Sequence, residues 1–265
     1  SRRWGFGSTP CEATAGGGEA ADQPEDWRSF RNRLVLQENN VPEVVPSPGS
    51  GDDEDWAHEI WKAEPGCVLL ANPTKFRGGQ QSFFRKGAIL LVEHDNAVGS
   101  VGFLLNRPTT FVVGDVAPSL ALFANCPLHI GGPVGDGLQF IHRIPDVHGS
   151  AEVMDGVYYG GDLRHAAYLV RQLGVTREGM ARLAASFRFF HRYCSWGPGQ
   201  LSRELSNSTV GAPLDPPSPV WFTAATAPGL AFEGDSQGVR ERTDSDLWNT
   251  ILRRMAYRPM GLGGR

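Results

Sequence analysis

Short apolar runs bounded by Gly, Pro, Asn and Asp dominate the chain from Gly66 onward. Runs of this length and punctuation predict β-strands, and three of them follow one another at "CVLLANP", "GAILLVEHD" and "VGFLLNRPT". The polar segment "HDNAVGS" lies between the second and third runs and predicts the loop of a hairpin. Further strands are predicted at "LHIGGPV", "LQFIHRI" and "GVYYGG".

Helical spacing of apolar residues occurs in fewer segments. "DLRHAAYLVRQLG" has this spacing from Leu163 to Leu173 and stops at a glycine, so it predicts a helix. "SDLWNTILRRMAYR" predicts a terminal amphipathic helix, and "GPGQLSRELSNS" predicts a helix that begins after a turn. "ARLAASFRFFHRYC" stays open, because its first part is helical in composition while "SFRFFHRYC" alternates like a strand.

The residues before the first strand differ in character. They begin with a Gly/Ala-rich stretch, continue with "DWRSFRNRLVLQEN", which predicts an amphipathic helix capped by Asp26, and then enter a Pro-rich acidic linker. We divide the chain into a flexible tail (1–24), an N-terminal extension (25–63), a folded domain (64–257) and a C-terminal tail (258–265). Because strands mostly precede helices, the pattern predicts the α+β (mixed α/β) class: a central, mostly antiparallel or mixed sheet flanked by helices, with an N-terminal helical extension.

Composition and charge are those of a soluble globular protein. Of 265 residues, 40% are hydrophobic and 20% charged, and the net charge is −4. The first 60 residues hold 12 acidic and 5 basic side chains, so the acidic excess lies in the leading segment. The rest has no basic stripe that would neutralise phosphates, which argues against nucleic-acid binding. The apolar runs are too short to span a bilayer, so no transmembrane segment is expected.

The usual cofactor and metal signatures are absent from the sequence. There is no phosphate-binding loop motif, no G-x-G-x-x-G between a strand and a helix, and no H-E-x-x-H. The four cysteines form no C-x-x-C pair, which suits reduced thiols. We therefore expect no cofactor and no metal. The glycine-rich "GGPVGDG" (131–137) carries no lysine and precedes a predicted strand, which favours a tight turn joining two strands.

The segment "HRYCSWGPGQL" holds the residue types of a nucleophilic site. Cys194 or Ser195 could act as a nucleophile with a histidine such as His94 or His191 as base. The G-x-S-x-G elbow of hydrolases is missing, however. On a strand, residues three apart point to opposite faces, so His191 would point away from Cys194 and the thiol would be a small buried hydrophobe.

Two other groups of polar residues follow predicted strands. In "LVEHD", Glu93, His94 and Asp95 could bind a metal or transfer protons. Three adjacent residues at a strand end cannot all converge on one ion, however, which favours hydrogen bonds from His94 and Asp95 to loop backbone groups. In "NRP", Arg107 could hold an anionic ligand or a carboxylate of its own fold, and the structural ion pair is favoured.

An ordered set of motifs resembles the YqgE/AlgH family. The set runs "EHD", "VGFLLNRPT", "IGGPVGDGLQFIHR", "GVYYGGD" and "YCSWGPGQLSREL", and the resemblance covers about residues 64 to 257. The bacterial pattern is GLVLNRPT, then GGPV, then LGGD and G-WGPGQLE-E, so Ser195 stands where a glycine commonly precedes WGPGQ. The resemblance implies a small mixed α/β protein. It also implies a family whose bacterial members are described as proposed transcriptional regulators or as uncharacterised, with no agreed catalytic activity.

The leading segments "DWRSFRNRLVLQ" and "WAHEIWKAEPGCVLLANP" resemble the plant and algal members of the family, which are generally assigned to plastids. This resemblance implies a protein of the chloroplast stroma after removal of a transit peptide. The chain begins at Ser1 without methionine, and either transit-peptide removal or a shortened sequence would explain that start.

Two functions are compatible with these residues. The first is a non-catalytic binding or regulatory protein that meets an unknown protein partner through a surface built by the NRPT, GGPVGDG and WGPGQL loops, with Trp196 as anchor if it is exposed. The candidate surface comprises His94, Asp95, Asn106, Arg107, Gly131, Gly132, Pro133, Trp196, Gly197, Pro198, Gly199 and Gln200. The alternative is a hydrolase or thiol-dependent enzyme using Cys194 or Ser195 with a histidine. The absence of a convergent acid, base and nucleophile favours the first.

Overall fold

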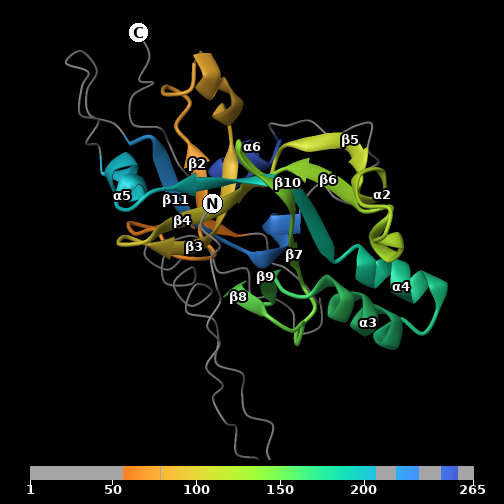
Figure 1. Ribbon diagram of the computed structural model, residues 1–265. Coiled ribbons are helices and arrows are strands. Elements are labelled where there is room, and N and C mark those ends of the chain that lie inside the picture. Colours follow the sequence, from red (N-terminus) through yellow and green to blue (C-terminus); the bar gives the residue numbers. More distant parts are fainter. Residues whose placement is uncertain (1–55, 78, 207–218, 233–245, 256–265) are drawn as a thin grey trace, which may run out of the picture.

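Eleven strands pair into one sheet in the part of the chain that the computed structural model describes, residues 56–77, 79–206, 219–232 and 246–255 (Figure 1). The strands are β1 (Ala57–Glu59), β2 (Val68–Ala71), β3 (Ala88–Asp95), β4 (Gly99–Leu104), β5 (Pro108–Val112), β6 (Pro127–Ile130), β7 (Val134–His142), β8 (Ser150–Met154), β9 (Val157–Gly160), β10 (Phe187–Trp196) and β11 (Trp221–Thr226). The helix predicted at 26–39 and the tails at 1–24 and 258–265 lie outside the described residues.

Helices in the described residues are few and mostly short. The α-helices are α2 (Val113–Val116), α3 (Leu163–Leu173), α4 (Arg177–Ala184), α5 (Gln200–Leu205) and α6 (Asp246–Arg254), and the 3-10 helices are η1 (Gly79–Phe84), η2 (Ala121–Phe123) and η3 (Pro228–Phe232). Within the described residues, none of these helices has both the length and the hydrophobicity to cross a lipid bilayer.

The sheet is mostly antiparallel, as the sequence predicts. Its main path runs β1-β11-β2-β3-β4-β10-β7-β9-β8, and β6 joins through β10 and β5. The pairing of β6 with β10 is parallel. Strand β1 precedes residue 64 and pairs with β11, so part of the predicted N-terminal extension completes the sheet. The chain therefore has a mixed α+β fold with a large sheet and few helices.

The structure resolves the segment "ARLAASFRFFHRYC", which the sequence left open between helix and strand, and side-chain caps mark where the helices α3 and α4 begin. Asp162 accepts a hydrogen bond from the Arg164 N–H at 2.8 Å where α3 begins, and Thr176 accepts one from the Gly179 N–H at 3.0 Å where α4 begins. The chain leaves α4 and enters β10 at Phe187. "ARLAASFRFFHRYC" is thus helical in its first part and extended in its second.

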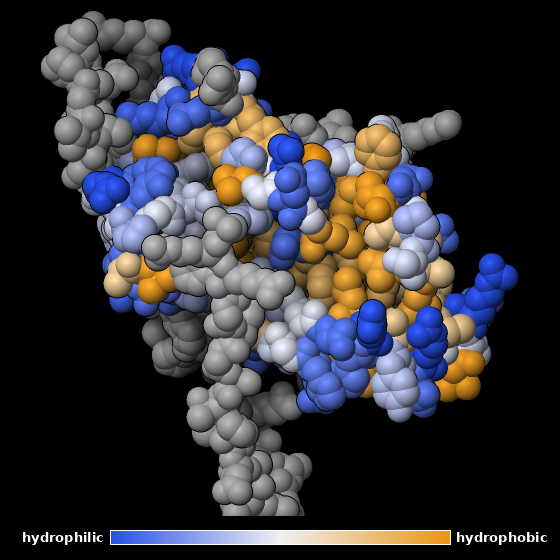
Figure 2. Space-filling view, viewed as in Figure 1, coloured by the Kyte–Doolittle hydropathy of each residue, from blue (hydrophilic) through white to orange (hydrophobic). Residues whose placement is uncertain are grey.

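Three clusters of buried residues cover the two faces of the sheet. One contains Phe103 and Phe190 and is closed by α6. A second contains Trp196 and Leu201 and takes in part of η1. The third lies beneath α3 and α4, which run together along one side of the molecule (Figure 1). Figure 2 shows hydrophobic side chains at the surface on the side of β5, β6 and α2, where this third cluster meets solvent.

The segment Gly131–Pro133 crosses the face of β10. β6 and β7 pair with opposite edges of β10, because Phe189 has a partner in each of them. A Cβ atom at Gly132 would lie 2.1 Å from the carbonyl carbon of Tyr193, and one at Gly131 would lie 2.4 Å from the carbonyl oxygen of Arg192. The segment joins two strands, as predicted, but as a crossing over β10 and not as a tight turn. The glycines are there because one backbone passes over another at contact distance.

Strand β10 changes direction at Arg192. This residue has a φ of +66°, and the pairing of β10 with β7 shifts register between His191 and Tyr193. Before the shift, Phe187–Phe190 are all buried. After it, Trp196 points into the second cluster and Tyr193 packs against the first. The strand thus joins the two halves of the sheet and presents alternate residues to different surroundings.

Candidate functional site

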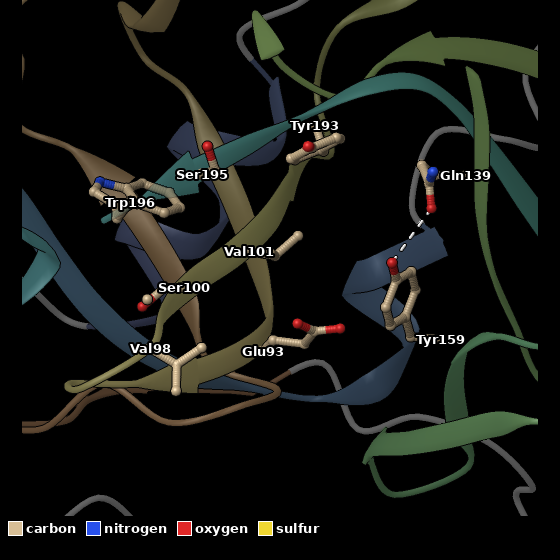
Figure 3. Close-up of a pocket in the computed structure, with 10 residues that line it drawn as sticks. Glu93, Val98, Ser100, Val101, Gln139, Tyr159, Tyr193, Ser195 and Trp196 are labelled. Carbon is tan, nitrogen blue, oxygen red and sulfur yellow. Dashed lines mark hydrogen bonds between the residues drawn. The ribbon is translucent and has the colours of Figure 1, made fainter. Parts of the chain in front are cut away.

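An open pocket of about 520 Å³ lies where the β3–β4 hairpin meets β10, β7 and β9 (Figure 3). Its lining residues are Glu93, Val98, Gly99, Ser100, Val101, Gln139, Tyr159, Tyr193, Ser195 and Trp196. They come from five strands and their connections, and each of the resembling motif segments supplies at least one of them. This volume falls in the range of small-molecule and side-chain sites.

The sheet pairing explains how the pocket is assembled. β4 lies between β3 and β10, with Ser195 opposite Val101 and Glu93 opposite the same residue on the other side. A register shift between Leu91 and Glu93 turns the end of β3. Val101 and Tyr193 pack against the buried cluster beneath the pocket. The walls are therefore held by strand pairing and core packing.

Tyr159 occupies one wall of the pocket in a fixed position. Its ring packs against Phe103 at a centroid distance of 5.5 Å, and its hydroxyl donates to the side-chain oxygen of Gln139 at 3.3 Å (Figure 3). Burial raises the pKa of Tyr159 to about 12, and the negative charge of Glu93 and the nearby Tyr193 add to the rise. Tyr159 is therefore a neutral hydrogen-bond donor at physiological pH.

His94 and Ser100 form a pair at the hairpin. The Nδ1 atom of His94 lies 2.8 Å from the Ser100 hydroxyl oxygen. Burial lowers the pKa of His94, while Asp95 raises it and Lys62 lowers it. Asp95 does not hold the imidazole, because its carboxylate accepts the N–H groups of Ala97 and Val98 at 2.6 and 3.0 Å. The expectation of loop backbone contacts is thus met by Asp95, whereas His94 bonds a hydroxyl. No cluster of three or more metal-ligating side chains occurs among the described residues.

Cys194 is a buried thiol away from the pocket. Its exposed fraction is 2%, and its sulfur donates to the carbonyl oxygen of Gly131 at 3.3 Å. Burial raises the pKa of the Cys194 thiol far above its usual range, so the thiolate needed for nucleophilic attack is scarce. Ser195 is exposed at the pocket, and no hydrogen bond from a histidine to it occurs among the described residues. Neither residue is activated.

The Trp196 side chain points into the protein interior, and its contacts there hold the WGPGQL corner in place. Its exposed fraction is 6%. The carboxylate of Glu204 accepts the indole N–H of Trp196 at 3.0 Å and that of Trp221 at 2.7 Å, together with the Gln200 amide at 2.8 Å. The two indole rings meet at 84° with centroids 6.0 Å apart. Gly199 has a φ of +64° where α5 begins. The corner is a braced turn, and the anchor role proposed for an exposed Trp196 does not apply.

Asn106 and Arg107 hold the chain around η1. The buried Asn106 side chain accepts the Ala88 N–H at 3.0 Å and donates to the Lys86 carbonyl at 2.8 Å. The Arg107 guanidinium donates to the carbonyl oxygens of Phe83 at 3.0 Å and Arg85 at 2.6 Å. These contacts of Arg107 are with backbone carbonyls, and its ion pair with a carboxylate of the fold stays a prediction.

The three motif loops lie at two ends of β4. The NRPT segment follows its carboxyl end, where the Arg107 carbonyl accepts the Ile130 N–H next to Gly131 and Gly132, which are also buried. The WGPGQL corner lies at the other end, where the Gly199 N–H donates to Asn96 at 2.9 Å. Six extended residues separate these ends by about 20 Å. Pro133, Gly197 and Pro198 are exposed, but the candidate residues as a whole do not form one surface.

The pocket includes residues that the sequence did not single out. One of them is Tyr193, which flanks the buried Cys194 opposite the earlier candidate Ser195, and this strand alternation was a usable signal for a surface-facing pair. Gln139 and Tyr159 carry no such signal, because strand order alone brings them to β10.

Comparison with known families identifies relatives across most of the chain. A family model described as AlgH-like matches residues 68–260. A "UPF0301 protein" of Chlorobium limicola is 35% identical over 179 residues, which are 66% of this chain and 82% of the relative. One of Chlorobium luteolum is 32% identical over 188 residues, covering 70% of this chain and 87% of the relative.

A solved structure has a similar fold. The crystal structure of a Corynebacterium diphtheriae protein covers 76% of this chain and 90% of its own, with a TM-score of 0.50 and 22% sequence identity. At this level of identity the likeness concerns the fold alone.

Proposed function

The chain belongs to the AlgH-like family, and we propose that it is a non-catalytic binding protein that recognises a protein partner at the open pocket beside the β3–β4 hairpin. A regulatory role would follow from the partner that it binds. The observation that carries the proposal is the lining of the pocket, which gathers hydroxyl, amide and aromatic groups from five strands on a braced frame. Rigid walls keep the cost of ordering the site on binding low.

The experiment is partner capture with a filled pocket. Ser195→Trp places an indole at an exposed position of the pocket wall and should abolish cross-linking to the partner that the wild-type chain captures from its native cell extract. Thr110→Trp adds the same group at an exposed position of β5, on another part of the sheet, and should leave capture unchanged.

Circular dichroism and the urea midpoint establish that both variants are folded. If Ser195→Trp captures the same proteins with the same yield as the wild type and Thr110→Trp, the pocket is not the binding site and the proposal is overturned.

A hydrolase is the second candidate, favoured by the contact between His94 and Ser100. The neutral imidazole would accept the Ser100 proton as the hydroxyl oxygen attacks an ester or amide carbonyl in the pocket. It would return that proton to the alcohol or amine that leaves when the C–O or C–N bond breaks, and water would then hydrolyse the acyl ester on Ser100. This pair differs from the Cys194 or Ser195 nucleophiles expected from sequence. A fluorophosphonate probe should label Ser100 in the wild type and lose that label in Ser100→Ala. Absence of labelling in the folded wild type removes this candidate.

Nucleic-acid binding is not part of the proposal. The residues after position 60 carry a near-neutral charge, and the pocket is lined by one acidic and no basic side chain among the described residues. A gel shift at low salt should show no retarded complex, and a salt-sensitive complex would contradict this expectation.

We also propose that the protein acts in the chloroplast stroma. The proposal is supported by the resemblance of the leading segments to plant and algal members, while the relatives described above are bacterial. Fusion of the complete gene product to a fluorescent protein at its carboxyl end should place the signal in plastids. A cytosolic signal would refute this location without affecting the pocket proposal.

A further inference from the structure

The side chains that line the pocket include a negative charge and aromatic rings but no positive charge among the described residues. Among the described lining residues, Glu93 is the only charged one, and Tyr159 and Tyr193 supply two aromatic rings, while the ring of Trp196 packs into the second cluster. Figure 3 shows Tyr193 and Ser195 across the opening from Glu93, with Tyr159 on the neighbouring wall. A carboxylate among aromatic rings attracts a cation, because the ring faces and the carboxylate are both electron-rich.

The negative charge of Glu93 is available to a ligand. Glu93 is exposed, and it has no ion pair with another described residue. The nearest cation along β10, Arg192, lies 3.7 Å from Asp136 on the strand beside it. The positive charge of Lys62 lowers the pKa of His94. His94 bonds Ser100 and does not itself line the pocket. An incoming cation would therefore meet no described positive charge on the pocket wall.

The rings and the amide complete the site. Tyr159 is held by Phe103 and by its hydrogen bond to Gln139, so its neutral ring stays in place when a ligand enters. Val98 and Val101 add apolar surface beside Glu93, which suits the methylene chain of an alkylammonium. An anionic ligand would face Glu93 without a described counter-charge.

We propose that this pocket takes an alkylammonium group, and that on the partner of the proposed function this group is the end of a lysine side chain. The inference rests on that proposed function and adds the chemistry of the recognised group. The lysine methylenes lie along the valines, and the ammonium lies between the Glu93 carboxylate and the tyrosine rings.

The test is a titration of the isotope-labelled full chain, followed by amide NMR signals. The capped peptide Gly-Ala-Lys-Ala-Gly should shift signals at Glu93, Tyr159, Tyr193 and Ser195. The same peptide with norleucine in place of lysine should bind about tenfold more weakly, as expected for the loss of an exposed ion pair and a cation–π contact. Equal binding by the norleucine peptide would overturn the proposal. The third ligand, n-butylammonium, should bind more weakly than the lysine peptide, and equal affinity would overturn the assignment to a peptide side chain.

A matched pair of variants isolates the charge. Glu93→Gln keeps the shape of the side chain and should reduce affinity for the lysine peptide by about threefold to fivefold, with little change for norleucine. Glu178→Gln removes an exposed carboxylate on α4, away from the pocket, and should change neither affinity. If Glu93→Gln retains the full preference for lysine, the proposal fails.

The proposed function can survive that failure. Loss of partner capture in Ser195→Trp, together with unchanged capture in Glu93→Gln, would keep the pocket as the binding site and reject its ammonium chemistry. Unchanged capture in both variants would reject both.

Discussion

The buried residues that support the pocket, here called the frame, tolerate fewer side chains than the exposed residues that line it, here called the wall. The frame contains the glycine crossing over β10 and the Glu204 carboxylate beneath the WGPGQL corner, where each atom has a close neighbour. The wall presents exposed Glu93 and Ser195, whose side chains have room around them. This difference shows that glycine-rich and tryptophan-containing motifs can mark places where the backbone is tightly packed. The polar side chains that could bind a ligand lie next to these motifs.

The comparison predicts that changes in the frame cost stability and that changes in the wall cost binding. A buried clash or an unsatisfied buried donor destabilises the folded state, whereas most exposed substitutions change its free energy of unfolding little. Stability and binding measurements on the same variants can therefore separate the two regions.

The largest effect is expected for Gly132→Ala. The new Cβ would lie 2.1 Å from the Tyr193 carbonyl carbon, so one of two crossing backbones must move. We expect a loss of about 3 kcal/mol or more in the free energy of unfolding, measured by urea denaturation, or failure to fold.

Gly197→Ala is the control for this change, since its Cβ would have the Gln200 side-chain oxygen at 3.9 Å as its nearest neighbour and should cost less than about 0.5 kcal/mol. Similar losses for both glycines would contradict the crossing argument.

The next largest effect is expected for Glu204→Ala. This change leaves the indole N–H groups of Trp196 and Trp221 without their acceptor, at a cost of about 2 to 4 kcal/mol by urea denaturation. Glu204→Gln keeps one acceptor oxygen and should lose less. If the alanine variant is as stable as the wild type, the corner is not braced by this carboxylate.

The third prediction concerns the pH at which Tyr159, in the pocket wall, loses its proton compared with an exposed tyrosine. Its pKa in the folded chain, about 12, exceeds the ordinary value of 10, so the folded state holds this proton more tightly than the unfolded state. The contribution of Tyr159 to stability is therefore complete below pH 10 and is lost as the pH rises toward 12. Phenolate absorbance should reveal a late-titrating tyrosine that is missing in Tyr159→Phe, and titration of all tyrosines near pH 10 would contradict the burial of this ring.

The smallest effect on ligand binding at the pocket is expected for a substitution of Cys194, which is buried away from it. Because burial raises its pKa, iodoacetamide at mildly alkaline pH should modify Cys194 more than about tenfold faster in urea than in the folded chain, as peptide mass spectrometry would show. Cys194→Ala should leave the affinity for the lysine peptide unchanged. Rapid labelling of Cys194 in the folded chain would restore a thiol-dependent mechanism to consideration.

Much of the fold was predictable where local patterns are strong. The hairpin between β3 and β4 was visible because Asp95 ends an apolar run and its carboxylate then holds the turn. α3 was visible from its apolar spacing and from the glycine at which it stops. β11 was missed, since "WFTAAT" is short and mixes large and small residues, and β1 was missed because three residues carry no period.

The candidate site was predictable only in part. The motifs led to the neighbourhood of the pocket, and Trp196 both belongs to a motif and lines it. Glu93 was considered only as part of a pattern for metal binding or proton transfer, and Tyr159 was not considered. Their proximity depends on the order of strands in the sheet, which no local pattern encodes.

By itself, the sequence determined the apolar strands, the amphipathic helices, the family resemblance and the burial of Cys194, because these depend on patterns within short segments. The tertiary structure alone decided that the glycines of "GGP" serve a backbone crossing, that Trp196 turns inward onto Glu204, and that Glu93 and Tyr159 share a pocket. Those outcomes arise from contacts between segments distant in the chain, whose geometry is set by strand order and by the bend of β10 at Arg192.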